Sequence, residues 1–137
     1  MAKDLKNLCA YELGELIDSK KIDPIYVLRF YLETYSQSNK NIKLSFVKVL
    51  KERAEKEAEM AWKRQKEGRR KGLLDGIPIA WKDMIHLKGY PALAGSMLMS
   101  DKKNNHKVND ADIVVLAKKA GLISLAKTGT VEFAFGG

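Results

Sequence analysis

The segment from Gly76 to Lys82 constrains the fold more than any other part of this chain. It reads Gly-Ile-Pro-Ile-Ala-Trp-Lys, a short apolar run that a glycine opens and a lysine ends. Such a run is too short for a helix and predicts a buried strand, in which Pro78 donates no ladder hydrogen bond. A second apolar run, Leu122–Leu125, follows a helical pattern that ends at Gly121. This order of helix, strand, loop, helix and strand predicts an α/β fold.

The helices are predicted from apolar spacing and from their start signals. Asp23 is placed to cap a helix whose first position is Pro24. Asn109 or Asp110 is placed to cap a later helix. The other expectations are a helix over residues 8–21, an extended piece over 42–46, a helix over about 47–67, and inward-facing positions at Ile113, Leu116, Ala117 and Ala120.

Composition excludes several classes of protein. The 137 residues suit one soluble domain, and no stretch approaches the roughly 18 apolar residues of a membrane span. One cysteine, Cys9, agrees with a reducing compartment, so the cytoplasm is the expected location. Cys9, His86 and His106 lack the spacing of a zinc site, and we expect no metal and no cofactor.

The net charge of +8 raises the question of a nucleic-acid partner. Most basic residues are spread along the chain, and the densest group, within residues 63–71, has no interleaved aromatic residues for base stacking. A solvated basic surface is therefore favoured over a nucleic-acid-binding surface. Salt-sensitive RNA affinity of residues 63–71 would reverse this view.

Lys82 is the candidate catalytic residue. A lysine at the end of a buried strand loses hydration, which disfavours its charged form and allows it to act as a base toward a hydroxyl. The alternative is a strand-end lysine whose amine reaches water. The spacing of the residues alone leaves both interpretations open.

The chain resembles the amidase-signature family over nearly its whole length and in the family's order. Residues 74–83, Leu-Asp-Gly-Ile-Pro-Ile-Ala-Trp-Lys-Asp, resemble the block that carries the family's catalytic lysine. Ala94-Gly95-Ser96 resembles a family loop, and residues 110–121, 126–128 and 132–134 resemble the helix, strand and turn that follow. The resemblance implies a mixed sheet flanked by helices. It also implies that residues 1–137 are the N-terminal portion of one amidase domain, helical over 1–70 and entering the α/β core over 71–137.

The resemblance further implies a serine hydrolase with a Ser-cisSer-Lys triad that acts on small carboxamides without a cofactor. Lys82 would be the base, Asp83 would help to fix the region of the lysine, and Ser96 would be structural. Both family serines lie downstream of the block that ends this sequence. The isolated chain is therefore expected to be inactive.

Two alternatives stay open. The same blocks occur in the amidase-family subunit of glutamine-dependent tRNA amidotransferases, which would imply partner subunits in place of a homodimer. Gly129-Thr130, where many members have Asn-Met, leans slightly toward a general amidase. The second alternative is a truncated, non-catalytic interaction module. Substrate and oligomeric state are not fixed by the sequence.

Overall fold

A three-stranded mixed sheet forms the centre of the protein. The computed structural model describes residues 5–100 and 108–136. The strands are β1 (Phe46–Val49), β2 (Pro78–Lys82) and β3 (Ile123–Thr128), in the order β1-β3-β2. The central strand β3 pairs parallel with β2 and antiparallel with β1. The predicted α/β class and mixed sheet are confirmed.

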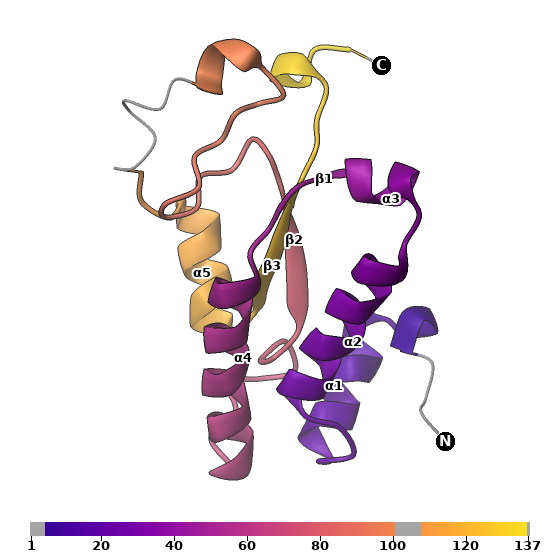
Figure 1. Cartoon of the computed structure of the whole chain (residues 1–137). Helices are drawn as coiled ribbons and strands as arrows, with labels where there is room; N and C mark the ends of the chain where they lie inside the picture. The colour runs from indigo at the N-terminus through magenta and orange to yellow at the C-terminus, as the bar shows by residue number, and fades with distance from the viewer. Residues whose placement is uncertain (1–4, 101–107, 137) are drawn as a thin grey trace.

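Helices lie on both sides of this sheet. Figure 1 shows α5 on one side of the strands and the α1–α2 pair on the other. The helices are α1 (Ala10–Asp18), α2 (Pro24–Gln37), α3 (Lys40–Leu44), α4 (Lys51–Lys66) and α5 (Asp112–Ala120), and the short 3-10 turns are η1 (Leu5–Asn7), η2 (Met97–Ser100) and η3 (Glu132–Ala134).

Three hydrophobic clusters hold these layers together. One joins α1, α2 and the approach to β2 through Ile17, Val27 and Ile77. A second packs α2 and the small alanines of α4 against β3, with Leu28, Ala54, Ala58 and Ile123 at its centre. The third packs α5 and the loop after β2 against the sheet, with Leu50, Trp81, Leu87 and Val114 at its centre. Ala54 and Ala58 lie on the face of α4 that packs into this second cluster, and their small side chains let that helix approach its neighbours closely.

Two of the predicted helix signals are confirmed. The side chain of Asp23 accepts a hydrogen bond of 2.7 Å from the backbone N–H of Tyr26, and Pro24 is the first residue of α2. Gly121 follows α5 with φ 89°, a left-handed conformation that glycine adopts without steric cost.

Residues 40–50 differ from the prediction. The expected extended piece over 42–46 lies mostly in the short helix α3, which Asn39 caps through a hydrogen bond of 3.0 Å from the N–H of Ile42. Val47 lies in β1, so the expected helix begins only at Lys51. The segment over 1–70 thus contains a strand. The apolar spacing typical of a helix continues without a break from Val47 into α4. Residues 46–49 nevertheless form a strand, because β1 pairs with β3.

The inward face of α5 also differs from the prediction. Val114 is buried, whereas Ile113 and Leu116 are 56% and 62% exposed. The N-cap position is Ala111 and makes no side-chain capping bond. The carboxylate of Asp110 is instead engaged by Arg53 through two parallel hydrogen bonds of 2.9 and 3.1 Å. A bidentate, charge-assisted pair is stronger than a cap, which explains the difference.

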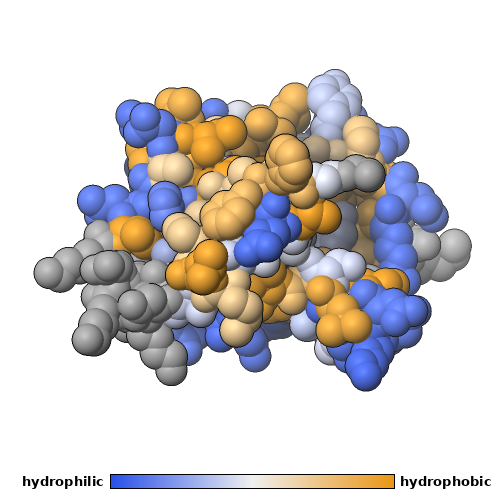
Figure 2. All heavy atoms as spheres, turned by 90° about the horizontal axis from the view of Figure 1, so that it is seen from above, coloured by the Kyte–Doolittle hydropathy of each residue, from blue (hydrophilic) through white to orange (hydrophobic). Residues whose placement is uncertain are grey.

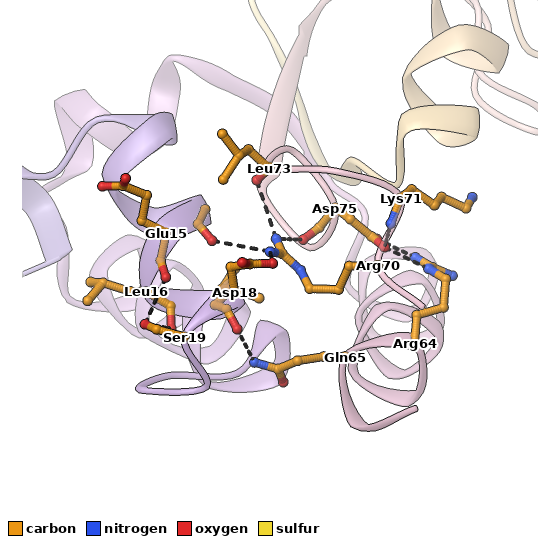
Figure 3. Close-up of polar contacts among 12 residues, drawn as sticks. Glu15, Leu16, Asp18, Ser19, Arg64, Gln65, Arg70, Lys71, Leu73 and Asp75 are labelled. Carbon is orange, nitrogen blue, oxygen red and sulfur yellow. Dashed lines mark hydrogen bonds and ion pairs between the residues drawn. The ribbon is translucent and has the colours of Figure 1, made fainter. Parts of the chain in front are cut away.

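Asp75 ties the segment before β2 to the rest of the chain (Figure 3). Its buried carboxylate accepts hydrogen bonds of 2.8 and 2.5 Å from Arg64 and one of 3.0 Å from the N–H of Lys71. Arg70 donates to the carbonyl of Asp75 and to the carboxylate of Asp18 on α1. Gly121 lies directly against Asp75, and a Cβ at position 121 would overlap the Asp75 carboxylate.

We therefore expect Gly121→Ala to destabilise the protein by about 2 kcal/mol or more, through left-handed strain and displacement of Asp75. Urea denaturation followed by circular dichroism measures this loss. Gly129→Ala is the matched control, because the nearest atom to a Cβ there is 3.7 Å away and φ is not left-handed. Equal stability of the two variants would contradict this interpretation.

The Arg53–Asp110 pair makes stability depend on pH. Burial by itself raises the pKa of Asp110, but hydrogen bonds from Arg53 and from the N–H of Lys88 outweigh it, so the pKa lies below its usual value. A lowered folded-state pKa gives stability that is present above the unfolded-state value and is lost as pH falls through the folded-state value.

We expect Asp110→Asn to be less stable than wild type at neutral pH, with the difference shrinking once pH falls below the ordinary aspartate value of 3.8. Thermal melts across acid pH measure this convergence. Asp112→Asn, at an exposed position in the first turn of α5, should show no comparable change. A difference between wild type and Asp110→Asn that does not change with pH would contradict the assignment.

Candidate functional site

Lys82 is the last residue of β2, where its backbone pairs in register with Thr128 of β3. Both parallel strands end here, at the end of the sheet from which the chain continues to η3 (Figure 1). The side chain of Lys82 is exposed. The sequence predicted that Lys82 loses its hydration at a buried strand end. In the part of the chain that the structure describes, this prediction is wrong, because the side chain is exposed to solvent. Its neighbours Trp81 and Asp83 are buried instead, because alternate residues of a strand point to opposite faces.

Asp83 is buried and lies opposite a second lysine that the sequence analysis did not select. The Nζ of Lys127 lies 2.6 Å from Oδ1 of Asp83, and both side chains are 2% exposed. Oδ1 has no partner at hydrogen-bond angles, although the distance is that of a close ion pair. We take the contact as an ion pair, because two opposite buried charges at this distance attract strongly whatever the angle.

Backbone bonds fix the position of this pair at the strand end. The N–H of Asp83 donates to the carbonyl of Thr128 at 2.8 Å, and the N–H of Ala94 donates to the carbonyl of Asp83 at 2.8 Å. The hydroxyl of Thr128 donates to the carbonyl of Trp81 at 3.3 Å. Asp83 thus joins β2, β3 and the loop that follows β2.

Lys127 also anchors the loop after β2. Its ammonium donates to the carbonyl of Pro91 at 2.5 Å and to that of Tyr90 at 3.4 Å. Lys127 and Trp81 are register partners on parallel strands, so their side chains leave the sheet on the same face. A signal for this was present in the sequence: a lysine within an apolar strand needs a buried acid, and Asp83 follows the other predicted strand directly.

Ser96 lies in the loop between β2 and η2 and is buried. Its hydroxyl donates to the carboxylate of Glu132 at 2.6 Å, and the N–H of Phe133 donates to the carbonyl of Ala94 at 2.8 Å. These bonds join the Ala94–Ser96 loop to η3. The hydroxyl of Ser96 is thereby engaged by Glu132.

The surface at this end of the molecule is unusually apolar. Figure 2 looks down on it and shows hydrophobic side chains gathered across the middle of the face. The elements at this end of Figure 1 are α3, η2, η3 and the chain after η3. They carry the exposed side chains of Leu44, Met97, Leu98, Val131, Phe133 and Phe135. Exposed apolar surface of this kind marks a contact face.

The remaining candidates from the sequence are the basic group of residues 63–71 and the two histidines. Within the basic group of residues 63–71, Arg64 pairs with Asp75, Arg70 with Asp18, and Arg69 with Glu67. The arginines therefore do not form a row of unpaired cations for a phosphate backbone. His86 accepts a hydrogen bond of 3.0 Å from the N–H of Ala92. His106 lies outside the described residues.

Two searches over residues 5–100 and 108–136 gave no site. Within these ranges no three His, Cys, Asp or Glu side chains are grouped closely enough to hold a metal ion. In the same ranges no helix has the length and apolar character needed to cross a bilayer.

Comparison with known proteins gives consistent matches. The family model described as Amidase matches residues 26–137. A glutamyl-tRNA(Gln) amidotransferase subunit of Acinetobacter baumannii (strain ATCC 17978) is 34% identical over 97% of this chain. The chain spans 26% of that relative's length.

Solved structures show the same fold. The peptide amidase of Stenotrophomonas maltophilia superposes with a TM-score of 0.83 at 23% identity, covering 95% of this chain and 26% of that one. An amidase family protein from Bacillus anthracis superposes with a TM-score of 0.78 at 26% identity, covering 94% of this chain and 25% of that one.

The buried pair makes a prediction about stability. Lys127→Met leaves the carboxylate of Asp83 buried without a counter-charge and should destabilise the protein by about 3–5 kcal/mol in urea denaturation. The double variant Asp83→Asn with Lys127→Met removes both charges and should recover much of this loss. The single variant Asp83→Asn completes the comparison. If the loss of stability in the double variant equals the sum of the losses in the two single variants, the two residues are not coupled.

Proposed function

Because the chain belongs to the amidase family, we propose that it is the N-terminal portion of one amidase domain and supplies the base, Lys82, of a C–N hydrolase. The observation that carries this proposal is the placement of Lys82. Its amine is exposed at the carboxyl end of β2, while the next residue, Asp83, is held by Lys127 and Thr128. A lysine amine on a strand end suits proton transfer, because backbone hydrogen bonds position the strand while the nitrogen reaches outward.

In the proposed reaction Lys82 takes a proton from a bridging serine held by a cis peptide bond. That serine takes the proton of the nucleophilic serine, whose oxygen attacks the amide carbonyl. The proton held by Lys82 passes back through the bridging serine to the leaving nitrogen, so that the amine leaves as the acyl-serine forms. Water, which gives up a proton by the same route, then releases the acid. Both serines come from polypeptide beyond the sequence described, so we expect the 137-residue chain by itself to be inactive.

The exposed amine needs cover before it can act as a base. A solvated lysine is held in its charged form by water, whereas a neutral amine requires a drier setting. The curated and solved relatives are about four times as long as this chain, which spans 26% of each. We propose that further polypeptide covers Lys82 and the exposed hydrophobic face around η2 and η3.

The substrate class is proposed as a small carboxamide, with a cytoplasmic location and no cofactor. A second candidate is the amidase-family subunit of a glutamine-dependent tRNA amidotransferase, in which the same chemistry releases ammonia for partner subunits. The curated relative described above supports this candidate, since it is such a subunit and is 34% identical over 97% of this chain. A non-catalytic interaction module is the third candidate, and the exposed apolar face is the feature that favours it.

A chimaera tests the proposal. Residues 1–137 replace the corresponding part of the Acinetobacter baumannii amidotransferase subunit, and ammonia release is measured from glutamine and from a simple carboxamide. We expect an active chimaera, and loss of about 100-fold or more on Lys82→Ala, because a general base contributes at least that much.

Lys88→Ala is the matched control, since Lys88 is also exposed and lies in the loop that follows β2. It should retain nearly full activity. Retention of activity by Lys82→Ala would refute the role of Lys82, and a folded but inactive chimaera would favour the interaction module. Labelling of the isolated chain by a serine-directed fluorophosphonate would refute its expected inactivity.

A further inference from the structure

A groove between α4, α5 and the loop after β2 brings together lysines from three parts of the chain. Its volume is about 380 Å³, within the range of about 300–1,000 Å³ that small-molecule sites occupy. Lys56 lines it from α4, Lys88 from the loop, and Lys118 from α5. All three are exposed, and over residues 5–100 and 108–136 none of them lies within ion-pair distance of a carboxylate.

A largely buried network of charges holds these three segments around the groove. The carboxylate of Asp110 accepts hydrogen bonds of 2.9 and 3.1 Å from Arg53 of α4 and one of 2.7 Å from the N–H of Lys88. Glu57 accepts one of 3.0 Å from Arg53 and one of 2.7 Å from the N–H of Ser124. The side chains of Glu57 and Asp110 are only 10% and 14% exposed. These two acids are therefore already engaged by the protein's own donors, and the exposed lysines are not.

The charge left at the surface of the groove favours an anion with more than one negative charge. Among the described residues that line it, the remaining acid is Glu52, one turn before Lys56 on α4. Glu52 can offset one lysine, which leaves two ammonium groups for a ligand. A phosphate monoester carries about −1.5 to −2 charges and three acceptor oxygens, so it suits separate ammonium donors better than a carboxylate does.

Two side chains of apolar character complete the wall of the groove. Met60 is 48% exposed, and Tyr90 is half-buried. A methionine sulfur and a tyrosine ring both pack favourably against an aromatic ring. A ligand whose phosphate meets the lysines can therefore place a small apolar body against this wall.

We propose that this groove binds a phosphate monoester with a small apolar or aromatic body, through Lys56, Lys88 and Lys118. The bonds of Asp110 to Arg53 and to the N–H of Lys88 form the groove in the absence of ligand, which reduces the ordering cost of binding. The proposal concerns binding alone and does not rest on the role of Lys82 as a base.

Titration of phenyl phosphate into the isotope-labelled 137-residue chain tests the proposal by amide NMR. We expect saturable shifts at the amides of Lys56, Lys88, Tyr90 and Lys118. Raising the salt from about 20 mM to about 150 mM should weaken binding, because salt screens exposed charges. Inorganic phosphate, which has no apolar body, should bind more weakly than phenyl phosphate. The absence of saturable shifts, or equal affinity for the two probes, would overturn the proposal.

Charge-removing variants locate the site. Lys118→Gln should weaken the affinity for phenyl phosphate by about threefold, the size of effect expected of one exposed ion pair. Lys119→Gln is the matched control, because Lys119 is the exposed neighbour of Lys118 on α5 and does not line the groove. It removes the same charge and should leave the affinity unchanged.

Equal losses in Lys118→Gln and Lys119→Gln would show that the anion responds only to the net positive charge of the chain, and would overturn the proposal. Lys88→Gln and Lys56→Gln repeat the test from the loop and from α4, so the result does not depend on the folding of one variant. Each should weaken binding by a similar factor, and full affinity in both would likewise contradict the assignment.

Discussion

The ion pair between Asp83 and Lys127 is the interaction on which this end of the molecule depends. It joins the two parallel strands β2 and β3 to the loop that leaves β2. Two buried charges cost much desolvation energy, so such a pair is retained where it specifies geometry more than where it adds stability. Here the geometry specified is the position of the strand end that carries Lys82.

The pairing of β2 with β3 places one lysine, Lys127, inside the protein and another, Lys82, on its surface. Alternation along the strands directs Lys127 and Asp83 into the protein, while Lys82 points outward from the strand end. The inner lysine serves as a fixed counter-charge and the outer one remains available. In the proposed hydrolase these are complementary tasks, since a base must be free of local acids and its backbone must not move.

The sequence predicted what depends on local chemistry. Pro24, Asp23 and Gly121 take the positions expected of them because each satisfies a requirement of its own helix end. The sheet and the family were predicted because the apolar runs and the Lys82 block are local too. What could not be predicted depends on contacts between distant residues: Asp110 pairs with Arg53 instead of capping α5, and Val47 lies in β1, which pairs with β3, instead of beginning a helix. The burial of Lys127 and the exposure of Lys82 could not be predicted either, because the strand register decides which lysine faces inward.

The most direct test of this account is lysine NMR of the Nζ groups in the 137-residue chain, assigned with Lys127→Arg and Lys82→Arg. The account predicts an ammonium signal of Lys127 that exchanges slowly with water and responds to Asp83→Asn, and a signal of Lys82 that exchanges rapidly and does not respond. Rapid exchange at Lys127, or a response of Lys82 to the loss of Asp83, would contradict it.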